Sequence, residues 1–234
     1  MPNWCYNNLR VQTADNWDSD TKKMDKENEK DKKELAKFKK ENFNDNTLTF
    51  QKAAPMPEEL NITSGSSTNQ AIALINANNG DYKDVDKMLD YQWTAKDCGF
   101  TKNATLKTKR NKIIKYLKEN TTVNEMKEGQ QALDNLKKYG YKDWYNWRIN
   151  NWGTKWDACE GGMRDSEWEI EATFDTAWAP PTPWLEKVSA KYKRLKFTLE
   201  YTEEGMGFEG KAYARAGDVA DNSMRIDYPD NFWD

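Results

Sequence analysis

The chain has 234 residues, a formal net charge of −3 and no histidine. Aromatic residues make up 13% of the sequence, so enough apolar area is available for folding and global disorder is not expected. The missing imidazole excludes Ser-His-Asp and Cys-His catalytic units and histidine metal ligands. Three widely separated cysteines predict neither a disulfide framework nor a zinc site, and we expect no cofactor and no bound metal.

The chain begins Met1-Pro2-Asn3-Trp4, without a basic start or an apolar run, so we expect no signal peptide. No stretch of about 18 consecutive apolar residues occurs, which predicts no transmembrane helix and no membrane partner. A cytoplasmic location is therefore expected.

The first part of the chain predicts a strand, a helix and a second strand. In residues 5–13 the apolar side chains of Leu9 and Val11 share one face, which is typical of a half-buried strand. Residues 15–42 lack glycine and proline and are rich in Lys and Glu, which favours a solvated helix. Residues 47–53 predict the second strand, ended by the prolines that follow it.

The middle of the chain, up to about residue 140, predicts a series of helices from apolar stripes at helical spacing. The clearest helix starts at Thr122, whose hydroxyl forms a capping box with Glu125. Gly140 is the expected residue just beyond its end.

A tryptophan-rich segment, predicted to be a connecting loop, separates these helices from a second region of strands. There the period switches to two, and a proline pair is expected to end the first of these strands. The predicted elements are a strand at 168–175, a helix with Thr182 as its N-cap, a strand at 195–201, and a C-terminal hairpin at 208–228.

This order predicts an α+β protein: a ferredoxin-like split β-α-β antiparallel sheet with a helical insertion and a C-terminal hairpin. The predicted domains are a sheet domain at 1–57 and 160–234, a helical insertion at 58–140, and the tryptophan-rich connecting segment at 141–159.

Four phrases in the sequence are specific enough to suggest a family. They are Met1-Pro2-Asn3-Trp4-Cys5-x-Asn7, Tyr145-x-Trp147 followed by Asn151–Asp157, Thr176-Ala177-Trp178-x-Pro180-Pro181, and Tyr201-x-Glu203-Glu204-Gly205. Together they resemble the YubB or Api-type family of phage and plasmid proteins. The resemblance implies a ferredoxin-like domain of unknown function, encoded on bacterial mobile elements and acting in the bacterial host cell. It assigns no catalytic residue.

The main candidate site is an aromatic hub formed by a polar, tryptophan-containing segment and two later residues. Indoles supply flat walls, a glycine allows close backbone approach, and polar groups fix orientation, which suits a ligand or partner pocket. The candidate residues are Asn151, Trp152, Gly153, Thr154, Lys155, Trp156, Asp157, Trp178 and Glu204. The alternative is structural: a loop that packs its tryptophans on the sheet and satisfies its own backbone groups.

Three functions remain open from the sequence. The leading hypothesis is a non-enzymatic binding module that contacts a host protein or a small ligand through the hub, with a role in countering host defence. The second is a metal-assisted hydrolase or nucleotide-processing enzyme that uses Asp157, Glu203, Glu204 and Lys155. The third, a nucleic-acid-binding protein, is disfavoured because the glutamates that alternate through residues 168–174 would repel phosphates.

Overall fold

The computed structural model describes residues 3–14 and 21–226. The chain forms two compact units, Met1–Met56 with Trp147–Asp234, and Pro57–Asn146. We call them the sheet unit and the helical unit. Within the described residues, every helix is too short or too polar to cross a lipid bilayer.

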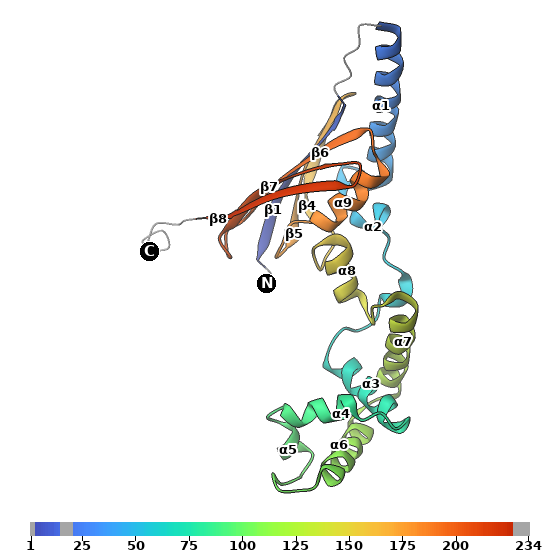
Figure 1. Cartoon of the computed structure of the whole chain (residues 1–234), viewed down its shortest axis with the longest axis vertical. Coiled ribbons are helices and arrows are strands. Elements are labelled where there is room, and N and C mark those ends of the chain that lie inside the picture. The colour runs from blue at the N-terminus through green and yellow to red at the C-terminus, as the bar shows by residue number, and fades with distance from the viewer. Residues whose placement is uncertain (1–2, 15–20, 227–234) are drawn as a thin grey trace. The chain divides into compact units, whose positions relative to one another are not determined.

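The sheet unit contains a six-stranded sheet with the order β4-β5-β1-β6-β7-β8, in which all neighbours are antiparallel (Figure 1). The strands are β1 (Trp4–Thr13), β4 (Cys159–Asp165), β5 (Glu169–Ala177), β6 (Leu195–Glu203), β7 (Phe208–Arg215) and β8 (Asp218–Arg225). Helix α1 (Thr21–Asn42) follows β1, and α9 (Thr182–Lys191) connects β5 to β6. The first four strands of this order therefore form a βαββαβ ferredoxin-like arrangement, which β7 and β8 extend. The predicted fold class is confirmed.

The two faces of the sheet differ. Helices α1 and α9 lie on one face (Figure 1), where Leu9 and Val11 of β1 are fully buried. Ring pairs join the helices to this face, with Phe38 of α1 5.6 Å from Phe197 of β6. Alternate residues of β1, beginning with Trp4 and Tyr6, point to the opposite side, which we call the open face. Tyr6 is 53% exposed there.

Helix α1 is attached to the sheet unit by charge as well as by its apolar side. Arg194, just before β6, forms ion pairs with Glu27 and with the buried Asp31. Its backbone N–H also donates to Glu34 at 2.8 Å. This Lys/Glu-rich helix is therefore held in a defined position on the core.

The predicted strand at residues 47–53 is wrong. Only Thr47–Leu48 (β3) is extended, and it pairs with Phe43–Asn44 (β2) in a separate two-stranded sheet. Helix α2 (Phe50–Ala53) follows, because the hydroxyl of Thr49 accepts the N–H of Gln51 and caps it.

Strand β4, which the sequence pattern does not predict, instead takes the second strand position of the ferredoxin-like motif. Both of its faces are largely exposed, and it contains Gly161 and Gly162, so it shows no period of two. A bulge interrupts its pairing with β5 between Cys159 and Gly162.

The tryptophan-rich segment, predicted as a loop, contains helix α8 (Trp144–Trp152). The Asp143 carboxylate accepts the N–H of Tyr145 at its start, and Gly153 adopts a left-handed φ of 89° just beyond its end. Helix α9 also begins one residue earlier than predicted, because Thr182 is its first residue rather than its N-cap.

The helical unit packs its helices around a small apolar core. Its helices are α3 (Ser66–Asn78), α4 (Lys83–Lys87), α5 (Thr94–Asp97), α6 (Leu106–Asn120) and α7 (Val123–Tyr139), with 3₁₀ turns at Glu58–Leu60 and Met88–Asp90. The core consists of Ala73, Leu74, Ala77, Val85, Met88, Cys98, Ile113 and Leu117. The predicted capping box at Thr122 and Glu125 is confirmed, and Gly140 ends α7 with φ 75°.

Candidate functional site

Gly153 and Thr154 join the tryptophan-rich segment to the loop after β5. The hydroxyl of Thr154 donates to the carbonyl of Ala177 at 3.0 Å and accepts its N–H at 3.1 Å. A Cβ on Gly153 would lie 2.6 Å from Cδ of Pro183 and 2.9 Å from the carbonyl oxygen of Pro180. The two segments thus meet, and these two residues act by packing.

Trp152 and Asn151 also serve the packing of the sheet unit. Trp152 is 1% exposed, and its indole N–H donates to the carbonyl of Ala54 at 2.9 Å. Its ring lies 5.9 Å from that of Phe50 and 5.7 Å from that of Trp147. The Asn151 amide donates to the Trp147 carbonyl at 2.7 Å and accepts from Lys187.

Asp157 caps helix α2. Its carboxylate accepts from the hydroxyl of Thr49 at 2.6 Å, from the N–H of Phe50 at 2.6 Å and from the N–H of Ala158 at 2.9 Å. The bonds to Thr49 and Phe50 join positions 108 and 107 residues apart in the chain. The carboxylate is therefore engaged in holding the fold.

Three other candidates from the hub, Lys155, Trp156 and Trp178, lie together at the surface. Nζ of Lys155 is 4.6 Å from the ring centroid of Trp156 and 5.5 Å from that of Trp178. The ring of Trp4, which is not among the nine predicted site residues, lies 5.9 Å from that of Trp156. Trp156 is 37% exposed and Trp178 is 41% exposed. We call Trp4, Lys155, Trp156 and Trp178 the aromatic rim.

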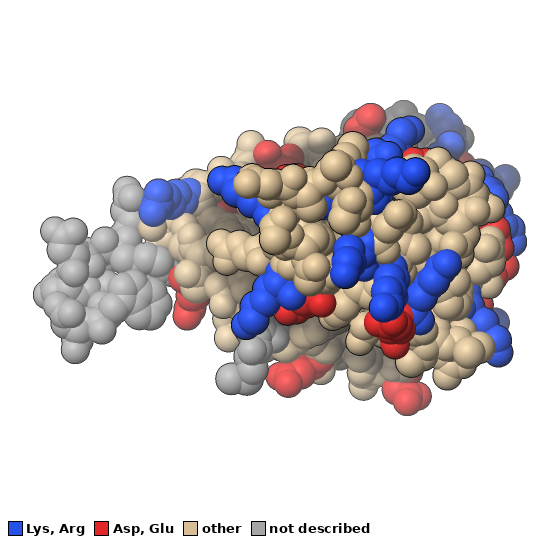
Figure 2. All heavy atoms as spheres, turned by 90° about the horizontal axis from the view of Figure 1, so that it is seen from below, with Lys and Arg blue, Asp and Glu red and all other residues tan. Residues whose placement is uncertain are grey.

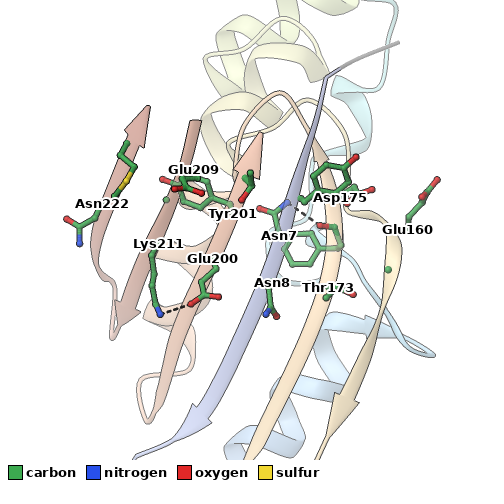
Figure 3. Close-up of a pocket in the computed structure, with 16 residues that line it drawn as sticks. Asn7, Asn8, Glu160, Thr173, Asp175, Glu200, Tyr201, Glu209, Lys211 and Asn222 are labelled. Carbon is green, nitrogen blue, oxygen red and sulfur yellow. Dashed lines mark hydrogen bonds and ion pairs between the residues drawn. The ribbon is translucent and has the colours of Figure 1, made fainter. Parts of the chain in front are cut away.

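A cavity of about 830 Å³ lies on the open face of the sheet (Figure 3). None of the nine predicted site residues lines it. Its lining includes Tyr6, Asn8, Glu160, Thr173, Asp175, Glu200, Thr202, Glu209, Lys211, Asn222 and Met224. Because Trp4 and Tyr6 are two residues apart on one strand, their side chains share a face, and Trp4 places one ring of the aromatic rim next to this cavity.

The cavity is acidic. Four carboxylates (Glu160, Asp175, Glu200, Glu209) and one amine (Lys211) line it, so its formal charge is 1 − 4 = −3. Lys211 donates to Glu200 at 2.6 Å from the neighbouring strand (Figure 3), which neutralises the amine. In the part of the chain that the structure describes, no ion pair engages the other three carboxylates.

Two polar groups in the cavity are poorly satisfied by the protein itself. Burial, followed by the nearby charge of Glu160, raises the pKa of Asp175 above its ordinary value. Among the described residues, Oδ1 of Asn8 is shielded from solvent and accepts no hydrogen bond. A ligand that carries positive charge and N–H donors would satisfy both groups.

The carboxylates of the enzyme hypothesis lie in two separate places, the β6–β7 turn and the start of α2. Glu203 is 1% exposed and accepts the N–H groups of Gly205 at 3.0 Å and Met206 at 2.5 Å, which fixes the β6–β7 turn. Glu204 is exposed on this turn, whereas Asp157 caps α2. Across residues 3–14 and 21–226, no group of three or more metal-ligating side chains could hold a metal ion.

The cavity residues were missed although the sequence contained a signal for them. The acidic residues of β5 and the polar residues of β1 were recognised as a solvent-facing alternation. A ferredoxin-like sheet with both helices on one face leaves the other face open, so these residues had to line up across neighbouring strands. Tyr6 pairs with Asp175 on one side and with Thr202 on the other.

Comparison with known proteins bears on the strands that build this cavity. Residues 151–228 match a family described as "Ferredoxin-like domain in Api92-like protein". The crystal structure of protein api92 from Yersinia pseudotuberculosis is similar over 98% of this chain and 99% of its own, at 12% identity and a TM-score of 0.37. No curated protein matches the chain. The region from β4 to β8 is therefore similar to the ferredoxin-like domain of Api92-like proteins, and this part of the predicted resemblance is confirmed.

Proposed function

We propose that the chain is a non-enzymatic binding module whose open face receives a lysine- or arginine-bearing segment of a partner protein. The observation that carries this proposal is the cavity of formal charge −3 beside a rim of exposed indoles. Carboxylates pair with ammonium and guanidinium groups, and indole faces attract the same groups by cation–π interaction. The ammonium group of Lys155 lies 4.6 Å from the ring centroid of Trp156, so an indole of this surface already contacts a cation.

A protein segment fits this surface better than a small ligand does. The cavity lies on a sheet face and draws its lining from all six strands of the sheet, so an extended chain could place several side chains along it. A small ligand remains the second candidate, because the volume is within the range of small-molecule sites.

The biological setting is part of the proposal. The resemblance to the phage and plasmid proteins of the YubB or Api type suggests a mobile-element protein that acts in the cytoplasm of its bacterial host. The partner would then be a host protein, and the mobile element would benefit because host defence is countered. In the aromatic rim, Lys155, Trp156 and Trp178 are the predicted site residues that we retain as partner contacts, with Glu204 on the adjoining turn.

The test is binding of a labelled lysine-rich decapeptide, measured by fluorescence anisotropy, with a glutamate-rich decapeptide as the charge control. The double variant Asp175→Asn/Glu209→Gln should weaken binding about tenfold, because two uncompensated acids are removed. The variant Trp156→Ala should weaken it about fivefold by loss of a cation–π contact.

The matched control is Glu29→Gln/Glu119→Gln, which changes two helix acids whose side chains are 63% and 62% exposed and do not line the cavity. It should leave binding unchanged. Equal binding by the wild type and the cavity variant would refute the proposal, provided that both show the same thermal unfolding. The same variants used as bait in a bacterial lysate would then identify the partner by mass spectrometry.

A further inference from the structure

A second surface of opposite charge lies in the helical unit. Residues 98–118 contain seven basic residues and no acidic ones, namely Lys102, Lys107, Lys109, Arg110, Lys112, Lys115 and Lys118. Six of them belong to helix α6. Figure 2 looks onto the side of the helical unit that carries α5 and α6, where Lys and Arg side chains gather with a few acidic side chains among them.

Some of these basic side chains are bonded within the helical unit, and others are not. Arg110 is paired with Asp86 through two hydrogen bonds of 2.7 and 2.5 Å. Nζ of Lys109 donates to the carbonyl of Lys102 at 2.9 Å. Three further lysines of α6 are exposed, and no ion pair within the described residues engages them: Lys107, Lys112 and Lys118.

The charge at the start of α6 does not serve the helix itself. Lys107 is in the first turn, which contains no acidic residue. The positive end of the helix dipole disfavours a cation there, typically by a few tenths of a kcal/mol. A basic residue at this position is explained by an external anion better than by helix stability.

Aromatic rings adjoin the basic helix. Tyr91 and Trp93 stack with centroids 6.3 Å apart and an interplanar angle of 30°, and Trp93 lies 5.7 Å from Tyr116 of α6. Tyr116 follows Lys112 by four residues, so the two side chains share a face of the helix. Tyr91 is 51% exposed. Lys107 and Lys118 lie about 180° and about 200° around the helix from Tyr116, so a strand that contacts all three lysines must pass around α6. Basic groups beside accessible rings are the pattern that binds single-stranded nucleic acid.

We propose that the helical unit binds single-stranded nucleic acid, with phosphates on the exposed lysines of α6 and a base stacked on Tyr91. This site is independent of the proposed function of the open face. An anionic membrane is the less suitable partner, because the apolar face of α6 is already used: Ile113 and Leu117 are 0% exposed in the core of the unit. A helix that binds a bilayer must insert that face.

The experiment measures anisotropy of a fluorescein-labelled 20-nucleotide oligo(dT) with the full chain at several salt concentrations. The test variant is Lys107→Gln/Lys112→Gln/Lys118→Gln. The control is Lys26→Gln/Lys33→Gln/Lys40→Gln, which removes the same charge from exposed positions of α1. If each lysine contacts one phosphate, the test variant should lose about 100-fold in affinity at ~0.1 M salt, and its salt slope should fall by about 2. The control should bind as the wild type does.

Tyr91→Ala separates stacking from charge. It should weaken oligo(dT) binding at least about fivefold with an unchanged salt slope. Equal affinity of the wild type and the α6 variant would overturn the proposal, as would equal losses in the α6 and α1 variants. Tighter binding to a 20-base-pair duplex, or binding to phosphatidylserine vesicles without binding to oligo(dT), would overturn it as well.

Discussion

Replacement of Asp157 by alanine should lower the stability of the sheet unit. The sequence pattern predicts Asp157 on a partner-binding surface, where its loss would leave stability unchanged. In the structure its carboxylate accepts from Thr49 and from the N–H groups of Phe50 and Ala158. Phe50 is 0% exposed, and its ring packs 5.0 Å from Trp184. An alanine would leave the start of α2 uncapped beside this core.

The magnitude follows from the bonds that are lost. Loss of a capping side chain destabilises by about 0.5–2 kcal/mol. A hydrogen bond to a charged group contributes about 1.5–3 kcal/mol, and water replaces only part of it at a half-buried site. We therefore expect Asp157→Ala to lower the free energy of unfolding by about 2–4 kcal/mol.

Urea unfolding followed by tryptophan fluorescence is the assay, with the transition of the sheet unit fitted separately, because two units need not unfold together. Asp165→Ala is the control, since Asp165 forms a half-exposed ion pair with Lys39 and should change stability by less than about 1 kcal/mol. If Asp157→Ala and the control have the same free energy of unfolding, the structural role is refuted. Asp157 would then again be a candidate for partner binding.

Two further predictions concern the cores. Gly129→Val should destabilise the helical unit by about 1–3 kcal/mol, because even a Cβ at Gly129 would lie 2.7 Å from Cβ of Ala71 in α3. The rate of amide hydrogen exchange should then rise in α3 and α7. An equal rise in β1 and β5 would contradict this prediction. Burial raises the pKa of the Cys5 thiol from 9.0 to about 12. Because the folded value exceeds the unfolded one, this contribution to stability is complete below pH 9 and is lost by about 1.4 kcal/mol per pH unit as the pH rises toward 12. The wild type should therefore lose more stability than Cys5→Ala between pH 9 and 11, and equal losses would show that the thiol is not protected.

The sequence predicted those elements in which one local pattern decides the outcome. Strand β1 alternates because one face of it is buried under helices, and Leu9 and Val11 are both 0% exposed. The helix from Thr122 to Gly140 carries its own start and stop signals, and the structure contains both. In each case the residues that determine the element lie within it.

The errors arose where a distant residue decides the outcome. Residues 47–53 have strand-like composition, but Asp157 supplies a carboxylate to the N–H of Phe50 and helps start a helix there. Strand β4 has no hydrophobic period, and its pairing with β5 places it in the sheet. The cavity depends on the register between strands, because the pairing places Asp175, Tyr6 and Thr202 next to one another across three strands. The register is not encoded in any one strand.

Trp178 connects the packing of the tryptophan-rich segment to the surface that it displays. Its backbone adopts φ 74°, a left-handed conformation that costs a residue other than glycine about 1–2 kcal/mol. Its N–H donates to the carbonyl of Asn3 at 3.0 Å, which holds the strained turn against the start of β1. A glycine would remove the strain and keep that bond. The indole instead remains 41% exposed above Lys155, so burial in a core does not explain why this position carries it. The strain is accounted for if the ring is needed outside the core, at the end of the acidic cavity.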